Sequence, residues 1–141
     1  MRVFFDTSVL VPVFIPGHEH HERSLAVFSK ADLHSGYCAA HSLAEVYATL
    51  TRLPGRYRAA PDQAIMCLEA IEGRLNPIAL EVAEYLAAIR EAAGIGIEGG
   101  ALYDALLGAC ADKSKANVLY TWNTRDFLRL GENLRGRVHT P

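Results

Sequence analysis

Val3-Phe4-Phe5-Asp6-Thr7-Ser8 is the stretch that decides the fold prediction, because it joins a short apolar run to an acidic turn. The apolar run predicts a buried strand, and Thr7 or Ser8 can cap a short helix after the turn. In open α/β sheets, ligands bind beyond the carboxyl ends of the strands, so Asp6 is expected to face a functional crevice. An ordinary N-cap role explains the position of Asp6 equally well.

The rest of the chain alternates strand-like apolar runs with segments of helical periodicity, which predicts an α/β fold with a mostly parallel sheet. Strands are predicted at 2–5, 35–39, 77–80 and 118–122, with a last one near Val138; helices are predicted at 22–31, 41–53, 61–74, 81–93, 101–115 and 125–130. The Gly-rich stretch 94–100 is expected to form a loop. With no internal repeat and no linker, residues 1–141 are predicted to form one domain.

Composition narrows the possible functions. Half of the 141 residues are hydrophobic, which is enough for a proper core. The net charge of −2 shows no general attraction to nucleic acid, which argues against a plain nucleic-acid-binding protein. The three cysteines are widely spaced and are expected to be buried, reduced thiols. No targeting or membrane-spanning segment is recognisable, so a cytoplasmic protein with no membrane partner is expected.

Three further acids follow the pattern of Asp6. Glu45 lies in a helical segment beside its apolar positions, Asp104 lies near the start of an almost wholly apolar helix, and Asp126 follows the strand at 118–122. Each has an alternative explanation: an exposed helical glutamate for Glu45, and a favourable helix dipole for the two aspartates. Carboxylates that meet at one sheet edge repel one another unless a cation neutralises them. A hard, oxygen-binding ion such as Mg²⁺ or Mn²⁺ is the expected partner.

At these residues the chain resembles the PIN-domain ribonucleases, in particular the VapC-like toxins of bacterial type II toxin–antitoxin pairs. The resemblance covers the whole chain and rests on four short motifs: Phe5-Asp6-Thr7-Ser8, His41-Ser42-Leu43-Ala44-Glu45-Val46, Tyr103-Asp104-Ala105-Leu106-Leu107-Gly108-Ala109-Cys110-Ala111, and Leu119-Tyr120-Thr121-Trp122-Asn123-Thr124-Arg125-Asp126-Phe127. It implies a sheet of about five strands flanked by helices and a metal-dependent endoribonuclease activity. It also implies homodimerisation and inhibition by a small antitoxin protein.

Carried onto this sequence, the resemblance assigns the three principal acidic positions to Asp6, Glu45 and Asp104 and a fourth to Asp126. Many relatives have Asp where this chain has Asn123, so binding of one metal ion or of two stays open. We expect Asp6 and Asp104 to hold Mg²⁺ directly, with Glu45 and Asp126 binding it or its waters. These four are also the predicted catalytic residues.

Substrate contacts are expected from residues around the same turns. Thr7, Ser8, Thr121 and Asn123 can bind a phosphate or orient a metal ligand, and Arg125 can contact the RNA backbone. The best basic cluster for the approach of RNA is Arg52, Arg56 and Arg58, although ordinary surface solvation explains each arginine singly. Which RNA is cut and which antitoxin binds are left open.

Several rival functions share features with this sequence. A non-catalytic PIN-like module that binds RNA or protein is the main alternative. A haloacid-dehalogenase-like phosphatase needs an Asp where this chain has Ser8. A receiver domain needs a Lys just after a late strand, but Lys113 and Lys115 precede the strand predicted at 118–122. The run His18-Glu19-His20-His21 has no third and fourth ligand nearby for zinc and is expected to be a solvated loop. Ser42 beside His41 lacks the nucleophile elbow of a serine hydrolase.

Overall fold

A sheet of five parallel strands forms the centre of the computed structural model, which describes residues 1–141. The strand order is β3-β2-β1-β4-β5, and the bounds are β1 Val3–Phe5, β2 Gly36–Ala39, β3 Asn76–Ile78, β4 Val118–Tyr120 and β5 Val138–His139. β1 is the central strand, with Phe5 opposite Cys38 on one side and Tyr120 on the other. The predicted parallel α/β fold is therefore confirmed.

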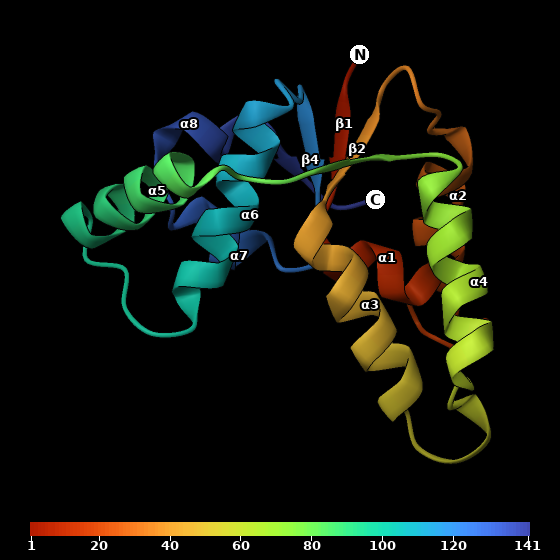
Figure 1. Ribbon diagram of the computed structural model, residues 1–141. Helices are drawn as coiled ribbons and strands as arrows, with labels where there is room; N and C mark the ends of the chain where they lie inside the picture. The colour runs from red at the N-terminus through yellow and green to blue at the C-terminus, as the bar shows by residue number, and fades with distance from the viewer.

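Helices cover both faces of this sheet. One group contains α1 Thr7–Val13, α2 His21–Lys30, α3 Ala40–Arg52 and α4 Pro61–Glu72; the other contains α5 Val82–Gly94, α6 Ala101–Lys113, α7 Thr124–Leu128 and α8 Glu132–Arg135. Figure 1 shows the two groups on opposite sides of the strands. We call them the first and the second helical layer.

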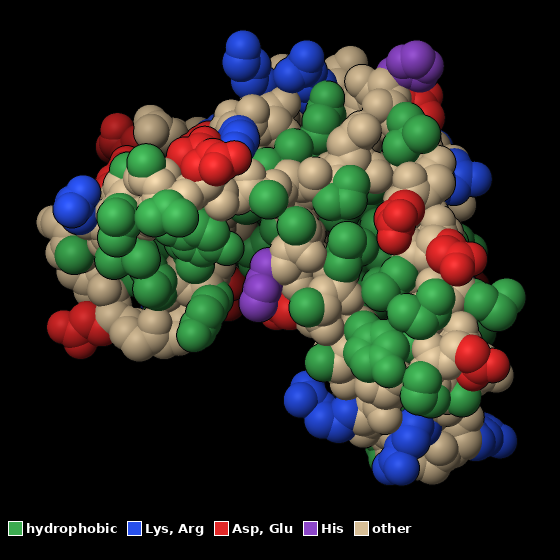
Figure 2. All heavy atoms as spheres, viewed as in Figure 1, with side chains coloured by type: hydrophobic (Ala, Val, Ile, Leu, Met, Phe, Trp, Pro, Cys, Tyr) green, Lys and Arg blue, Asp and Glu red, His purple; other side chains and the backbone are tan.

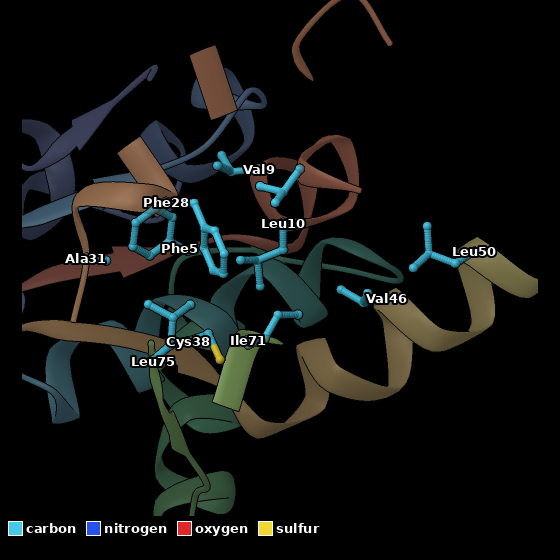
Figure 3. Packing of buried hydrophobic residues seen from close by; sticks show 11 residues of the cluster. Phe5, Val9, Leu10, Phe28, Ala31, Cys38, Val46, Leu50, Ile71 and Leu75 are labelled. Atoms are coloured by element: carbon cyan, nitrogen blue, oxygen red, sulfur yellow. The ribbon is translucent and has the colours of Figure 1, made fainter. Parts of the chain in front are cut away.

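The alternation of side chains along β1 builds a separate core under each layer. Phe5 lies in a cluster of 11 buried residues with side chains from α1, α2, α3 and α4 (Figure 3), whereas Phe4 lies in a cluster of 10 with side chains from α6, α7 and α8. Successive residues of a strand point to opposite faces, so two adjacent phenylalanines suffice to anchor both layers. The apolar run that precedes Asp6 therefore supplies one buried phenylalanine to each core.

One glycine allows the first layer to close on the sheet. A Cβ atom on Gly36, at the start of β2, would lie 2.6 Å from Leu75 Cδ2 and 2.9 Å from the Arg74 carbonyl oxygen. Real Cβ atoms do not approach other atoms so closely, so only glycine fits where α4 leads into β3. β3 begins at Asn76 and ends at Ile78, one residue before its predicted start and two before its predicted end.

Two short elements were not predicted, the 3-10 turn η1 at Gly55–Tyr57 and helix α8. Both are too short to show a periodic pattern in sequence. The cysteine prediction was correct for Cys38 and Cys110, but Cys67 is only partly buried; all three are free thiols. None of the helices combines the length and the apolar character needed to cross a membrane.

Candidate active site at the carboxyl edge of the sheet

Asp6 follows the end of β1 and is held from two sides. Its side chain is buried, with 4 % exposure, and its Oδ2 accepts hydrogen bonds from Ser8 Oγ at 2.7 Å and Thr121 Oγ1 at 2.8 Å. Burial raises the pKa of Asp6, and the bonds from Ser8 and Thr121 oppose that rise. Asp6 occupies the N-cap position of α1 without a side-chain capping bond, so the capping alternative does not account for its carboxylate.

Glu45 reaches the same edge from α3. Its Oε1 accepts a hydrogen bond of 3.1 Å from Thr7 Oγ1, which also lies 2.8 Å from Ser42 Oγ. His41 Nε2, one turn earlier on the helix, is 3.9 Å from the same carboxylate oxygen. Because Thr7 directly follows Asp6 in the chain, its bond to Glu45 brings the two acids to one place. Ser42 is fully buried, which excludes it as an exposed nucleophile.

Asp104 lies in the first turn of α6 and is half-buried. Burial is the main cause that raises its pKa to about 6, and the negative charges of Asp6, Asp126 and Glu45 raise it further. The charge of Arg129 acts in the opposite direction. The charges of all three other predicted acids therefore reach Asp104.

Asp126 completes the set from the first turn of α7. Its Oδ1 lies 3.1 Å from Nη2 of Arg129, one turn later on the same helix. The four acids therefore come from both helical layers, Asp6 and Glu45 from one side and Asp104 and Asp126 from the other. The site exists only where the two layers meet.

The residues predicted to contact substrate fall into two groups. The hydroxyls of Thr7, Ser8 and Thr121 are already bonded to the acids, so they orient the carboxylates. Asn123 and Arg125, in contrast, are exposed, and neither side chain makes a hydrogen bond or a salt bridge. Only the backbone of Asn123 is used: its N–H donates to Thr121 Oγ1, and its carbonyl oxygen accepts from the Asp126 N–H. Both side chains are free to bind a ligand.

The chemistry of this donor set fits a hard divalent cation. All four candidate ligands are carboxylates, and Arg129 is the only Lys or Arg that forms a salt bridge with any of them. As the side chains stand, however, no three His, Cys, Asp or Glu residues are arranged around one point suitable for a metal. Binding would therefore require small side-chain rotations, for example of Glu45 away from Thr7.

Sequence reasoning missed an aromatic stack beside the site. The His20 ring lies 3.7 Å from the Trp122 ring at an interplanar angle of 9°, and the Arg23 guanidinium carbon lies 5.4 Å from the Trp122 ring centre. The backbone N–H of Trp122 donates to Ser8 Oγ at 3.0 Å, which in turn binds Asp6. One histidine of the predicted solvated loop is therefore packed beside the site. The only feature of the sequence that could have indicated this stack is its single tryptophan, next to Thr121.

The predicted basic cluster lies elsewhere. Arg52 ends α3, and Arg56 and Arg58 belong to the connection that leads to α4. Figure 2 shows Lys and Arg side chains gathered at that outer tip, at the end of α3 opposite to the sheet. Arg129, which forms a salt bridge with Asp126, was not selected from the sequence.

Comparisons with known proteins identify the family and the fold. A family model described as PIN domain matches residues 3–133. The chain is 36 % identical over 133 residues to Ribonuclease VapC40 of Mycobacterium tuberculosis, covering 94 % of this chain and 92 % of that protein. It is 35 % identical to Ribonuclease VapC27 of the same organism, over 80 % of this chain and 79 % of that protein.

Solved structures with the same fold include the crystal structure of Mycobacterium tuberculosis VapC20, described as a toxin that cleaves the sarcin–ricin loop. It matches with a TM-score of 0.66 at 16 % identity, over 88 % of this chain and 92 % of that one. VapBC2 of Rickettsia felis, crystallised on a DNA fragment from its promoter, matches with a TM-score of 0.64 at 17 % identity, over 99 % and 98 % of the two chains. At such identities these structures show the shared fold.

Proposed function

Because this chain belongs to the PIN-domain family, among the VapC ribonucleases, we propose that it is the toxin of a VapBC-type toxin–antitoxin pair and hydrolyses RNA phosphodiester bonds. The observation that carries the proposal is that carboxylates from the end of β1, α3, α6 and α7 gather at one edge of the sheet, where burial raises the pKa of Asp104 to about 6 and the charges of the other three add to the rise. A cytoplasmic location, where RNA and the antitoxin are both present, is part of the proposal.

Mg²⁺ is the proposed cofactor, with Mn²⁺ as a substitute. Asp6 and Asp104 would hold it directly, and Glu45 and Asp126 would bind it or its waters. When bound, the ion would lower the pKa of a water molecule and neutralise the charge that builds on the phosphate. One ion suffices for this arrangement, since Asn123 brings no charge for a second.

The side chains supply the positioning. Ser8 and Thr121 fix the orientation of Asp6, and Thr7 holds Glu45 until substrate and metal enter. In-line attack by water breaks the bond between phosphorus and the 3′-oxygen of the upstream nucleotide, which leaves as a hydroxyl. The products are then a 5′-phosphate and a 3′-hydroxyl, whereas attack by the 2′-hydroxyl of the RNA would leave a cyclic phosphate. Asn123 and Arg125 would contact the phosphate backbone.

The proposed partners are a small antitoxin protein and a second copy of this chain. Helix α5 offers a surface for one of them, because only Ala92 of this helix is buried. Val82, Tyr85, Leu86 and Ile89 are exposed at the spacing of one helical face, and Figure 2 shows hydrophobic side chains gathered there. An apolar stripe of this kind marks an interaction site. We assign it to the homodimer, so Leu86→Glu should give a monomer by analytical ultracentrifugation.

The experiment for the activity uses purified protein, a single-stranded RNA and Mg²⁺. Asp6→Asn and Asp104→Asn should each lower the cleavage rate by at least about 10²–10³-fold, since each removes a charge that the reaction needs. Asp62→Asn, in the exposed first turn of α4, is the matched control and should cleave like the wild type. Undiminished cleavage by folded Asp6→Asn or Asp104→Asn protein would reject the site.

The alternative function is a non-catalytic PIN-like module that binds RNA or protein. It is compatible with side chains that do not yet place three ligands around one metal position. Titration with Mg²⁺ separates the two, because a ligand that binds only the folded state raises the melting temperature. A ribonuclease should show a rise that disappears in Asp104→Asn, and a binding module should show none.

A further inference from the structure

An open hollow lies between α7 and α8, outside the acidic site. Its volume is about 600 Å³, and only one of its seven lining residues is hydrophobic. The lining includes three arginines, Arg125, Arg129 and Arg135, against the single acid Glu132. On a chain whose net charge is −2, this is a local concentration of positive charge.

Two of these three guanidinium groups have no partner within the protein. Arg125 and Arg135 are exposed and make neither a salt bridge nor a side-chain hydrogen bond. Other arginines of the chain are used structurally: Arg74 binds two carbonyl oxygens of the α2 end, and Arg137 binds Asp112 and two carbonyl oxygens. The unused charges of the hollow are therefore available to a ligand.

The backbone builds this hollow on a firm base. Gly131 has a φ of 124°, in the region that favours glycine, and it turns the chain sharply between the two short helices. Phe127 and Leu134 are buried beneath and tie both helices to the second core cluster. This turn brings Arg135 to the same hollow as Arg125 and Arg129, which a continuous helix would not do.

Arg129 joins the hollow to the acidic site. Its guanidinium lines the hollow and also contacts the Asp126 carboxylate at 3.1 Å. Its charge is felt at Asp104, whose pKa it lowers against the effect of the other acids. A polyanion lying in the hollow would thus continue directly into the ring of carboxylates.

We propose that this hollow binds the phosphate backbone of the RNA strand next to the bond that is cut, with Arg125 and Arg135 as the phosphate-binding residues. The inference rests on the proposed ribonuclease function and assigns where its substrate lies. Guanidinium groups bind phosphate through two parallel N–H···O bonds. Because the chain as a whole carries no net positive charge, it needs such a local group of arginines to bind RNA. Backbone contacts of this kind give affinity and register without reading the sequence.

The test measures RNA binding without cleavage, so that it is independent of the catalytic proposal. A single-stranded oligonucleotide is titrated onto the Asp6→Asn protein at several KCl concentrations, in EDTA. Adding Arg135→Gln or Arg125→Gln should weaken binding about tenfold, the value of one charged hydrogen-bonded contact. Each should also reduce the slope of log K against log salt by about 0.7, one phosphate contact on a single strand.

Two further variants make the outcome decisive. Arg90→Gln, which removes an exposed arginine of α5, should leave both affinity and slope unchanged. Arg135→Lys keeps the charge and should restore the slope while recovering only part of the affinity. The proposal is overturned if Arg135→Gln and Arg125→Gln behave like Arg90→Gln, or if the parent shows no salt-dependent RNA binding. Cleavage retained by Asp6→Asn would instead reject the catalytic assignment, which separates the two failures.

Discussion

The cores beneath the two helical layers contain almost equal numbers of buried residues, 11 and 10, but differ in the size of their side chains. The first layer packs two phenylalanines, three leucines and an isoleucine with smaller residues and is closed around Phe5. The second includes three alanines against one in the first, and it borders the hollows of about 170 and 600 Å³, whereas the first layer borders one of about 230 Å³ beside α2. Larger buried side chains give more stabilisation, whereas a loosely covered face can present surfaces to other molecules. The comparison indicates that the first layer contributes more to stability and the second exposes more surface for binding, while the acidic site draws on both.

The cysteines give the largest expected difference between the layers. Cys38 is fully buried and burial raises its pKa to about 12, so modification by a thiol reagent should require global unfolding. Its labelling should be slower than that of a free thiol by at least about 10³-fold. Cys110 lines an apolar cavity of about 170 Å³ in the second layer and should react through local opening, well before Cys38. Cys67 should react first, being partly exposed.

Mass spectrometry after timed labelling gives the order of the three sites. Equal protection of Cys38 and Cys110 across urea concentrations would mean that both layers open only together, and the comparison would fail.

Core truncation should show a smaller difference in the same direction. Leu10→Ala removes a fully buried side chain of the first layer and should cost about 4 kcal/mol, because a closed cavity remains. Leu107→Ala should cost about 2 kcal/mol, since Leu107 already borders the open apolar cavity of the second layer. Urea unfolding of both variants measures the two values, with exposed Leu128→Ala as the control. A larger loss for Leu107→Ala would contradict the difference between the layers.

The smallest expected effect is a pH-dependent change in stability caused by Asp104, which lies where the two layers meet. The pKa of Asp104 is about 6 in the folded protein and near 3.8 when unfolded, so the folded state binds the proton more tightly. Without metal, stability from this group is fully present below pH 3.8 and is lost as the pH rises through about 6. Asp104→Asn should therefore raise the melting temperature in EDTA near neutral pH and change it little at about pH 4.

Added Mg²⁺ should stabilise the wild type more than Asp104→Asn, since the variant lacks one of the proposed ligands. If Asp104→Asn has the same effect on stability at both pH values, the pKa of Asp104 is not raised in the folded protein.

The sequence was sufficient for the parts of the fold that depend on periodic patterns. The apolar run before Asp6 and the apolar helix around Asp104 predicted two buried elements, and parallel order placed their acids at one edge. Contacts between distant side chains were not predictable in this way. The Arg129–Asp126 pair and the His20–Trp122 stack depend on short turns, such as the one at Gly131, whose geometry no periodicity reveals.

The predicted basic cluster shows that residues close in sequence need not lie near the site. Arg52, Arg56 and Arg58 are close in sequence and attracted attention for that reason, yet the helix that carries Arg52 runs away from the sheet (Figure 1). Arg125, Arg129 and Arg135 are spread over two short helices and were only partly selected. Charges that converge through a turn are harder to find than charges that are neighbours in the chain.

The position of Trp122 means that the intrinsic fluorescence of this protein reports on one place. It is the only tryptophan of the chain, its indole stacks on His20, and its backbone is joined through Ser8 to the carboxylate of Asp6. Contact with an imidazole changes indole emission, so movement of His20 should change the signal. Arrival of a metal ion or an RNA strand can thus be followed by stopped-flow emission without attaching any dye.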